Sequence, residues 1–277
     1  MVEMLQGIRF AEAPSGIILW WIILTGVHFD GHAQCRIDDK AFETGEIIRY
    51  DAYYNWGMIW LHAGEVEFSV TAKNYGGHSV YHLYAFGTTY KSYDWIFKVR
   101  EKYQSYVDRE TLAPFWYERD VTEGSYTAFE EYTFDYAHSL IHTCVRKRQN
   151  PGVTGTLPLT SCLFDVMSAV YYFRSVDVSR CRVGEEIPIR TILDSEVYHL
   201  HVRYLGKEEV TTRDRKTYKC IKFAVKLVEG TLFKGNEDAV IWVTDDGNKV
   251  PVIVEAQILV GSVKAILTGT QGLKHSE

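Results

Sequence analysis

Apolar and polar side chains alternate along most of the chain with a period of two residues. In residues 46–56, Tyr50 falls on an apolar face and Asp51 on a polar face, and residues 59–71 alternate again. Successive strand residues point to opposite sides of a sheet, so this pattern predicts half-buried β-strands. The glycine between the two segments predicts that they form a hairpin.

Further strand patterns follow, separated by turn sequences rich in Gly, Asp and Asn. Residues 90–96 interrupt the alternation and predict a short helical turn or loop, and residues 149–158 have the composition of a loop. The additional predicted strands cover residues 78–86, 97–107, 114–121, 126–136, 138–148, 185–193, 197–205, 208–213, 217–228, 238–244, 250–255 and 258–267.

One segment, residues 161–174 (SCLFDVMSAVYYFR), has a helical rather than a strand period. We predict an amphipathic helix that begins at Ser161 and ends at Arg174. An apolar stripe this wide requires burial, so we expect the helix to lie inside the sheet. The stripe consists of Leu163, Val166, Met167, Val170 and Phe173.

Consecutive strands with short connections indicate an antiparallel meander. The predicted fold is mainly β, a strongly curved antiparallel sheet or barrel of about twelve strands with one buried helix. All-β domains of 200–250 residues are common, so residues 34–277 are expected to form a single β-rich domain.

The amino terminus resembles an export signal, with a buried helix of the domain as the alternative. Residues 17–29 (IILWWIILTGVHF) are apolar and uncharged, too short for the about 20 residues of a membrane span but suited to the core of a signal peptide. Gly31 and Ala33 then predict cleavage after residue 33, which places the mature protein in the periplasm or cell envelope. Cys35 follows the cleavage site, but Gln34 before it disfavours lipidation.

Four further cysteines, Cys144, Cys162, Cys181 and Cys220, fit no zinc-binding spacing. An oxidising compartment would permit two disulfides, and burial as free thiols is the equal alternative. A Cys144–Cys162 bridge, which would tie a strand to the start of the helix, is one hypothesis.

Charge and composition exclude some functions. The chain has 30 Lys and Arg against 36 Asp and Glu, so it lacks the basic field expected of a nucleic-acid-binding protein. Nineteen Tyr, thirteen Phe and seven Trp supply ample apolar surface for a core.

Four segments, in the same order along residues 42–267, resemble a family of exported bacterial proteins known as domain of unknown function 3108. They are FETGEIIRYDAYYNWGMIWLHAGEVEF, FDVMSAVYYFR, TYKCIKF and IWVTDDGNKVPVIVEAQILVGSVKAIL. The resemblance implies export and a β-rich fold, and it implies no activity, cofactor or catalytic residue. By analogy of fold alone, the late hairpin is also similar to those of periplasmic lipoprotein-carrier half-barrels.

No motif for catalysis or for a cofactor is present: the sequence lacks a nucleophile elbow, a phosphate-binding glycine loop and an H-E-x-x-H metal motif. His199 and His201 share one strand face and form a weak metal-binding candidate, for which a solvated polar face is the stronger interpretation. The Asp245-Asp246-Gly247-Asn248 sequence lacks calcium-loop spacing and reads as a hairpin turn.

Two functions remain open. The first is a non-enzymatic carrier of a lipid or other amphipathic small molecule in a barrel cavity. The second is a structural or protein-interaction module of the envelope with a filled barrel. The ligand-binding candidates are Trp56, Trp60, Tyr84 and Trp242 on strands and Asp165 and Arg174 on the helix.

Overall fold

The computed structural model describes residues 37, 39–56, 59–148, 150–226, 238–257 and 261–275. All of them belong to one compact unit, Ala33–Glu277. The predicted signal peptide and Cys35 lie outside the described residues.

The first half of this unit is a run of antiparallel strands, each hydrogen-bonded to the next along the chain. A 3-10 turn, η1 (Lys91–Tyr93), and the single turn α1 (Asp94–Phe97) follow the third strand, which confirms the helical turn predicted over residues 90–96. The strands are β1 (Ile47–Trp56), β2 (Ile59–Tyr75), β3 (His78–Thr89), β4 (Val99–Asp108), β5 (Pro114–Glu123), β6 (Tyr126–Asp135), β7 (Leu140–Lys147) and β8 (Val153–Pro158).

The second half begins with a short strand and a helix and then returns to antiparallel pairing. Parallel neighbours need a crossover connection, and α2 supplies it between β9 and β10, which pair in parallel. The elements are β9 (Leu163–Phe164), α2 (Val166–Arg174), β10 (Glu186–Leu193), β11 (Glu196–Thr211), β12 (Thr217–Lys226), β13 (Asp238–Thr244), β14 (Pro251–Gln257) and β15 (Ser262–Gln271).

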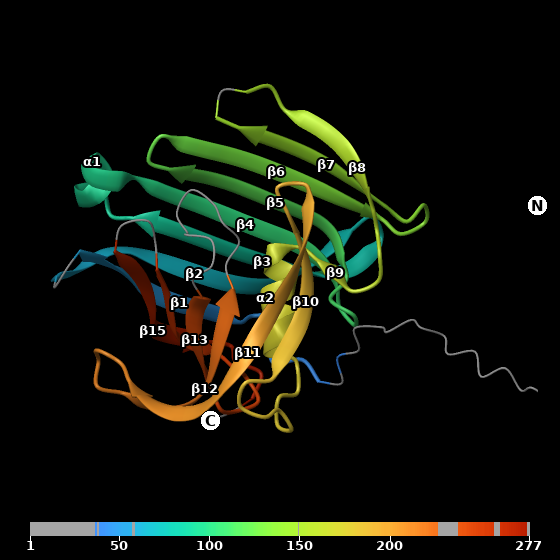
Figure 1. Cartoon of the computed structure of the whole chain (residues 1–277). Helices are drawn as coiled ribbons and strands as arrows, with labels where there is room; N and C mark the ends of the chain where they lie inside the picture. Colours follow the sequence, from blue (N-terminus) through green and yellow to red (C-terminus); the bar gives the residue numbers. More distant parts are fainter. Residues whose placement is uncertain are drawn as a thin grey trace, which may run out of the picture. The chain divides into compact units, whose positions relative to one another are not determined.

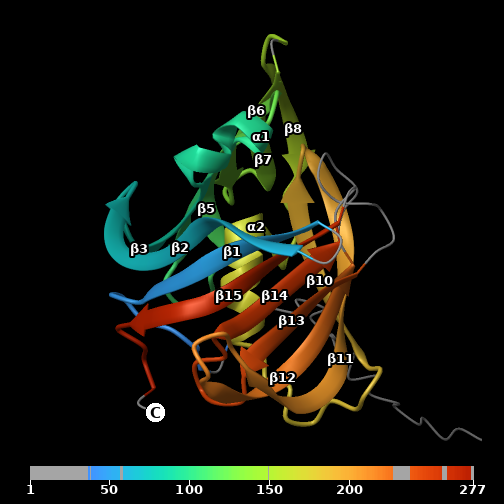
Figure 2. The same ribbon diagram turned by 90° about the vertical axis from the view of Figure 1, so that its left-hand side faces the viewer.

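The fifteen strands assigned in the described residues form one sheet in the order β8-β7-β6-β5-β4-β3-β2-β1-β15-β14-β13-β12-β11-β10-β9. The two halves of the meander join where β1 pairs with β15. Figures 1 and 2 show the sheet curving around α2, with β1, β15, β14 and β13 passing in front of the helix in Figure 2. The curved antiparallel sheet with a helix inside is therefore confirmed, and the sheet is open between β8 and β9.

Two strand predictions are wrong in detail. Residues 149–158 were expected to be a loop, but residues 153–158 form β8, an edge strand with almost every side chain exposed. Such a strand has no buried face, so no apolar alternation marks it. Residues 197–205 and 208–213 were expected to be separate strands, but β11 runs without a break from Glu196 to Thr211, with a register shift between Tyr204 and Gly206.

The helix is shorter than predicted because Asp165, rather than Ser161, caps it. The Asp165 Oδ1 atom accepts hydrogen bonds from the backbone N–H groups of Met167 (2.8 Å) and Ser168 (2.9 Å). These bonds satisfy two donors of the first helical turn. Leu163, expected in the helix, lies in β9 instead.

The buried face of α2 also differs from the predicted stripe. The buried residues are Met167, Ser168, Tyr171 and Arg174, whereas Val170 is 39% exposed. Two polar side chains, Ser168 and Arg174, are buried because each has a buried hydrogen-bond partner, Asp165 and Glu46 respectively. The spacing of apolar residues cannot reveal such partners.

Three apolar clusters form the core, and two of them pack between the helix and the strands. In the first, Met167 and Tyr171 pack with Phe42 and Leu83. In the second, Phe173 lies edge-on to Phe223 with ring centroids 5.0 Å apart. The third joins Ile48 and Tyr50 of β1 to Cys220, Val250, Val252 and Leu267. In the described residues, α2 therefore takes the place that a ligand would occupy in a hollow barrel.

Candidate functional site

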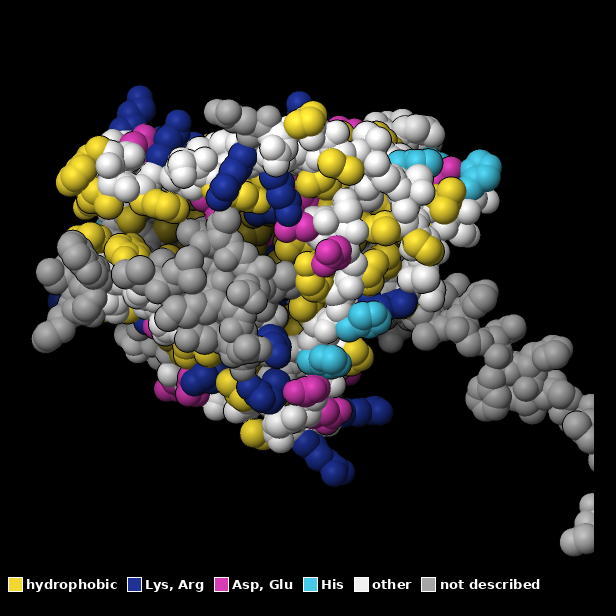
Figure 3. All heavy atoms as spheres, turned by 45° about the horizontal axis from the view of Figure 1, so that its top comes forward, with side chains coloured by type: hydrophobic (Ala, Val, Ile, Leu, Met, Phe, Trp, Pro, Cys, Tyr) yellow, Lys and Arg dark blue, Asp and Glu magenta, His cyan; other side chains and the backbone are white. Residues whose placement is uncertain are grey.

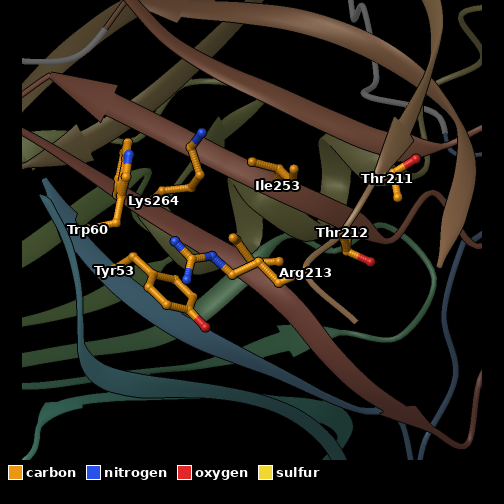
Figure 4. A pocket seen from close by; sticks show the side chains of 8 residues that line it. Tyr53, Trp60, Thr211, Thr212, Arg213, Ile253 and Lys264 are labelled. Atoms are coloured by element: carbon orange, nitrogen blue, oxygen red, sulfur yellow. The ribbon is translucent and has the colours of Figure 1, made fainter. Parts of the chain in front are cut away.

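A pocket of about 200 Å³ lies between the tip of the β11–β12 hairpin and the strands β1, β2, β14 and β15. This volume is below the roughly 300–1,000 Å³ of pockets that enclose a drug-sized ligand. It therefore suits the headgroup and the first apolar atoms of a larger molecule. The lining residues are Tyr53, Trp60, Thr211, Thr212, Arg213, Ile253, Lys264 and Ile266, most of which are labelled in Figure 4.

The strand register explains why the floor of the pocket is formed by these side chains. Tyr53 of β1 is directly opposite Lys264 of β15, and Ile253 of β14 is opposite Ile266. Cross-strand partners share a face, and alternate residues share it too. The pocket therefore lies on one side of the sheet.

That side is opposite to the helix. Ile48 of β1 pairs with Phe68 of β2, which packs in the cluster around α2. Tyr53 is an odd number of residues from Ile48 along the same strand, so its side chain points to the other face. The pocket is thus separate from the filled concave side.

The roof of the pocket comes from the turn after β11. The Thr212 hydroxyl donates to Asp214 Oδ1 (2.5 Å) and the Thr212 N–H donates to the carbonyl of Lys216 (2.9 Å). These bonds close a tight turn in which Arg215 has a φ of 66°. The Arg213 side chain extends from this turn toward the Tyr53 ring (Figure 4).

Two cations lie over two aromatic rings in this pocket. The Arg213 guanidinium carbon is 4.2 Å from the Tyr53 ring centroid, and the Lys264 ammonium is 4.8 Å from the Trp60 ring centroid. Such contacts contribute about 0.5–2 kcal/mol each and fix the direction of the cation. Both cations therefore line the same pocket.

The two cations differ in how far they are neutralised. Lys264 forms an ion pair with Glu255 (2.9 Å). Among the described residues, no carboxylate forms an ion pair with Arg213. The pocket thus carries one cation without an ion-pair partner among the described residues, beside an apolar floor of Ile253 and Ile266.

Tyr53 remains a neutral hydrogen-bond donor. Burial raises the pKa of its hydroxyl, and the Asp51 carboxylate adds to the increase. The hydroxyl donates to Asp51 Oδ2 at 3.2 Å, and the ring stacks on His62 with centroids 4.9 Å apart. This support keeps the Tyr53 ring in place beneath Arg213.

A second, more open pocket of about 770 Å³ lies on the other side of the same hairpin. Its walls include Lys216, Tyr218, Asp245 and Leu267. Asp245 is already paired with Lys207 at 2.8 Å, and Asp246 accepts hydrogen bonds from the N–H groups of the following turn. Both carboxylates therefore have partners within the protein. The hydrogen bonds of Asp246 confirm that the Asp245–Asn248 sequence forms a turn.

Asp165 and Arg174, the candidates on the helix, line neither pocket. The Ser105 hydroxyl donates to Asp165 Oδ2 at 2.7 Å, and burial raises the pKa of this carboxyl to about 6 despite its hydrogen bonds. Arg174 donates to both carboxylate oxygens of Glu46 and to the carbonyl of Asn248 (3.0 Å). Asp165 thereby connects the helix to β4, and Arg174 connects it to the residue before β1 and to the loop between β13 and β14.

The remaining candidates are dispersed. Trp60 is the one that the structure places in the Arg213 pocket, and Tyr84 is half-buried on the face of β3 away from the helix. The Trp242 indole N–H donates to Glu208, and its ring lies 4.9 Å from the Lys222 ammonium. The side chain of Trp56 lies outside the described residues.

His199 and His201 are exposed on β11. No group of three or more His, Cys, Asp or Glu suited to a metal was found in the part of the chain that the structure describes. The Cys144–Cys162 hypothesis is wrong, because Cys162 is disulfide-bonded and Cys144 is a free thiol. In the sheet, Cys144 of β7 is directly opposite Thr154 of the unexpected strand β8.

A buried polar network on β5 and β6 was not found from the sequence. Arg119 donates to Glu130 Oε1 at 2.6 Å, and the Tyr132 hydroxyl donates to the other Glu130 oxygen. The turn between β10 and β11 joins it, since the Asp194 N–H donates to Glu130 (2.9 Å) and the Ser195 N–H to Tyr132 (3.1 Å). The β10–β11 tip thereby reaches across to the first half of the sheet.

Next to this network two carboxyl groups share a strand face. Glu101 is opposite Val121, and Glu123 follows two residues later on β5. Burial raises the pKa of Glu101 to about 7, and the neighbouring Glu123 carboxylate adds to the increase. The sequence shows one sign of this pair, because an acid at position 101 interrupts the apolar face of the strand predicted over residues 97–107, whereas Glu123 lies beyond the strand predicted over residues 114–121.

These features define a class of protein: one strongly curved, mainly antiparallel sheet, open between its end strands, that holds a helix on its concave side. The chain belongs to the family described as "Protein of unknown function (DUF3108)", whose model matches residues 49–268. This confirms the family resemblance identified from the sequence.

A solved structure supports the fold. The "Beta-barrel-like Protein of Domain of Unknown Function DUF1849 from Brucella abortus" is 11% identical with a TM-score of 0.52, covering 83% of this chain and 98% of that one. A second structure, titled "a putative lipoprotein from Parabacteroides distasonis", is 10% identical with a TM-score of 0.32, covering 84% and 98%. No curated protein matches the chain. Within the described residues, no helix has the length and apolar character of a membrane span.

Proposed function

We propose that this chain is an exported, non-enzymatic protein of the cell envelope that binds an amphipathic small molecule with an anionic group. The export part of this proposal rests on the apolar run at residues 17–29 and on the small residues that follow it. The binding part rests on the pocket under the β11–β12 hairpin.

One observation supports the binding role most directly: two cations, Arg213 and Lys264, lie over aromatic rings in one pocket. Arg213 has no carboxylate partner among the described residues. A carboxylate or phosphate group would complete the hydrogen bonds of the guanidinium. The floor of Ile253 and Ile266 and the Trp60 ring would cover an adjoining apolar segment. A ligand with both parts fits this combination better than an inorganic anion does.

The ligand site differs from the one expected in a hollow barrel. The apolar clusters around α2 occupy the concave side in the described residues. We therefore assign ligand binding to the opposite face of β1 and β15, where the hairpin tip supplies the cation.

The same packed interior favours a second candidate function, a structural or protein-interaction module of the envelope. Such a module needs no ligand, because its own side chains complete the core. The two candidates differ in whether Arg213 and Lys264 act on a small molecule.

Native mass spectrometry of the full chain, purified from the envelope of an expressing bacterium, tests the proposal. We expect a bound anionic amphiphile that is lost from an Arg213→Gln variant. A ligand that binds only the folded state also raises the melting temperature, so octanoate should stabilise the wild type. Absence of both adduct and stabilisation would contradict ligand binding and favour the interaction module.

A further inference from the structure

A second surface of the protein, at α1, combines exposed apolar side chains with positive charge. Trp95 is 82% exposed, Ile96 56% and Phe97 43%, the three standing next to one another in the sequence. Most large apolar side chains of a soluble protein are covered, and a contiguous exposed group marks an interaction surface.

Cations flank this apolar group in the sequence. Lys91 and Lys98 are both exposed on either side of it. The one acid in the segment, Asp94, is neutralised by Arg100, with Nη2 and Oδ2 2.7 Å apart. Three cations against one acid leave residues 91–100 with a net charge of +2, although the whole chain is acidic. Figure 3 shows hydrophobic side chains beside Lys and Arg at its upper left, the side where Figure 1 places α1.

Hydrogen bonds attach α1 to the ends of β3 and β4. The Thr89 hydroxyl donates to Asp94 Oδ1 (2.9 Å) and accepts from the Val99 N–H (3.0 Å). The Phe97 ring lies so close to Gly124 that a Cβ there would come within 2.7 Å of it. A side chain at position 124 would displace Phe97, which gives this glycine a packing role. The apolar side chains of Trp95 and Ile96 are thus presented outward at little entropic cost.

We propose that α1 is a membrane-docking tip, which inserts Trp95 and Ile96 into the surface of an anionic lipid bilayer while Lys91 and Lys98 contact lipid headgroups. Tryptophan is favoured at the boundary between headgroups and acyl chains. Basic residues beside an apolar anchor add attraction to anionic lipid. A protein partner would fit the apolar part alone, whereas the paired lysines favour a negatively charged surface.

This inference is independent of the ligand pocket. Tyr53 and Arg213 do not contribute to α1, and the tip variants below leave the pocket residues unchanged. Failure of one proposal therefore leaves the other standing.

The test uses the full chain with vesicles of phosphatidylcholine and phosphatidylglycerol (70:30) that contain brominated acyl chains. Bromine quenches tryptophan at short range, so the readout is the difference in quenching between the wild type and Trp95→Phe. This difference cancels the contribution of the apolar run at residues 17–29. We expect Trp95 to be quenched on anionic vesicles and to require roughly tenfold more lipid in a Lys91→Glu/Lys98→Glu variant.

Val183→Ser is the matched control, because Val183 is 72% exposed in the loop between α2 and β10. It should leave Trp95 quenching unchanged, whereas Ile96→Ser should weaken it. Absence of Trp95 quenching on anionic vesicles would overturn the proposal. Equal quenching on pure phosphatidylcholine would overturn the role of the lysines. A lipid-independent dimer that protects Trp95 would identify a second copy of the chain as the occupant instead.

Discussion

Arg174 and Glu46 form a bidentate ion pair with no exposure to solvent on the Glu46 side, with Nη1–Oε1 and Nη2–Oε2 distances of 2.6 and 2.8 Å. The pair joins the end of α2 to the residue before β1. Removing one partner leaves the other buried without its counter-charge, which typically costs 3–5 kcal/mol. The pair therefore fixes the helix within the sheet.

We expect Glu46→Gln to lower the free energy of unfolding by about 3 kcal/mol or more, as measured by urea denaturation. The control is Glu67→Gln, which breaks the ion pair of Glu67 with Arg49 (2.8 Å) on the surface. Exposed pairs contribute only about 0–1 kcal/mol, so this control should be nearly neutral. Equal effects of the two substitutions would show that the buried pair does not hold the helix.

The orientation of α2 gives a second prediction. Met167 is 2% exposed and Val170 is 39% exposed. Met167→Asp should prevent folding or cost several kcal/mol, because it buries an unpaired charge. Val170→Asp should change the free energy of unfolding by about 1 kcal/mol or less. Circular dichroism and urea denaturation measure both. A severe effect at Val170 together with a mild one at Met167 would support the stripe expected from periodicity.

Stability should also depend on the protonation of Glu101. Its pKa in the folded protein, about 7, lies above the value of about 4.3 in an unfolded chain. The folded state then binds more protons than the unfolded state between these values. The free energy of unfolding should therefore fall as pH rises from about 4.5 to about 7, by an amount on the order of 2 kcal/mol.

Urea denaturation across this pH range measures the effect. Glu101→Gln should flatten the fall, leaving a smaller slope from Asp165, whose pKa of about 6 acts in the same direction. Glu209→Gln, at an exposed position of β11, is the control and should retain the slope of the wild type. An identical slope in Glu101→Gln would exclude Glu101 as its source.

The sequence predicted those strands whose two faces differ in burial. Ile48 and Tyr50 alternate with Arg49 and Asp51 because one face meets the core and the other does not. The edge strand β8 was missed for the converse reason, since neither of its faces is buried. The helix face was misjudged because Arg174 is buried through its ion pair and Val170 is partly exposed.

The candidate site was harder to predict than the fold. Aromatic composition identified Trp60, but Arg213 lies in a turn, where a charged residue is ordinary. Arg213 reaches Tyr53 because the long β11–β12 hairpin, with its register shift at Gly206, brings its tip to β1. Tyr53 and Arg213 are 160 residues apart in the sequence, and no local pattern specifies that contact.

The central claim is that Arg213 and Lys264 bind the anionic group of an amphipathic molecule. Isothermal titration calorimetry of the full chain with octanoate, octyl phosphate, octanol and octylamine tests it most directly. We expect the two anions to bind and Arg213→Gln to weaken binding roughly tenfold, equivalent to about 1.4 kcal/mol. Arg215→Gln, in the same turn but outside the pocket, should bind as the wild type does. Equal binding of octanol and octanoate, or equal affinity of Arg213→Gln and Arg215→Gln, would contradict the claim.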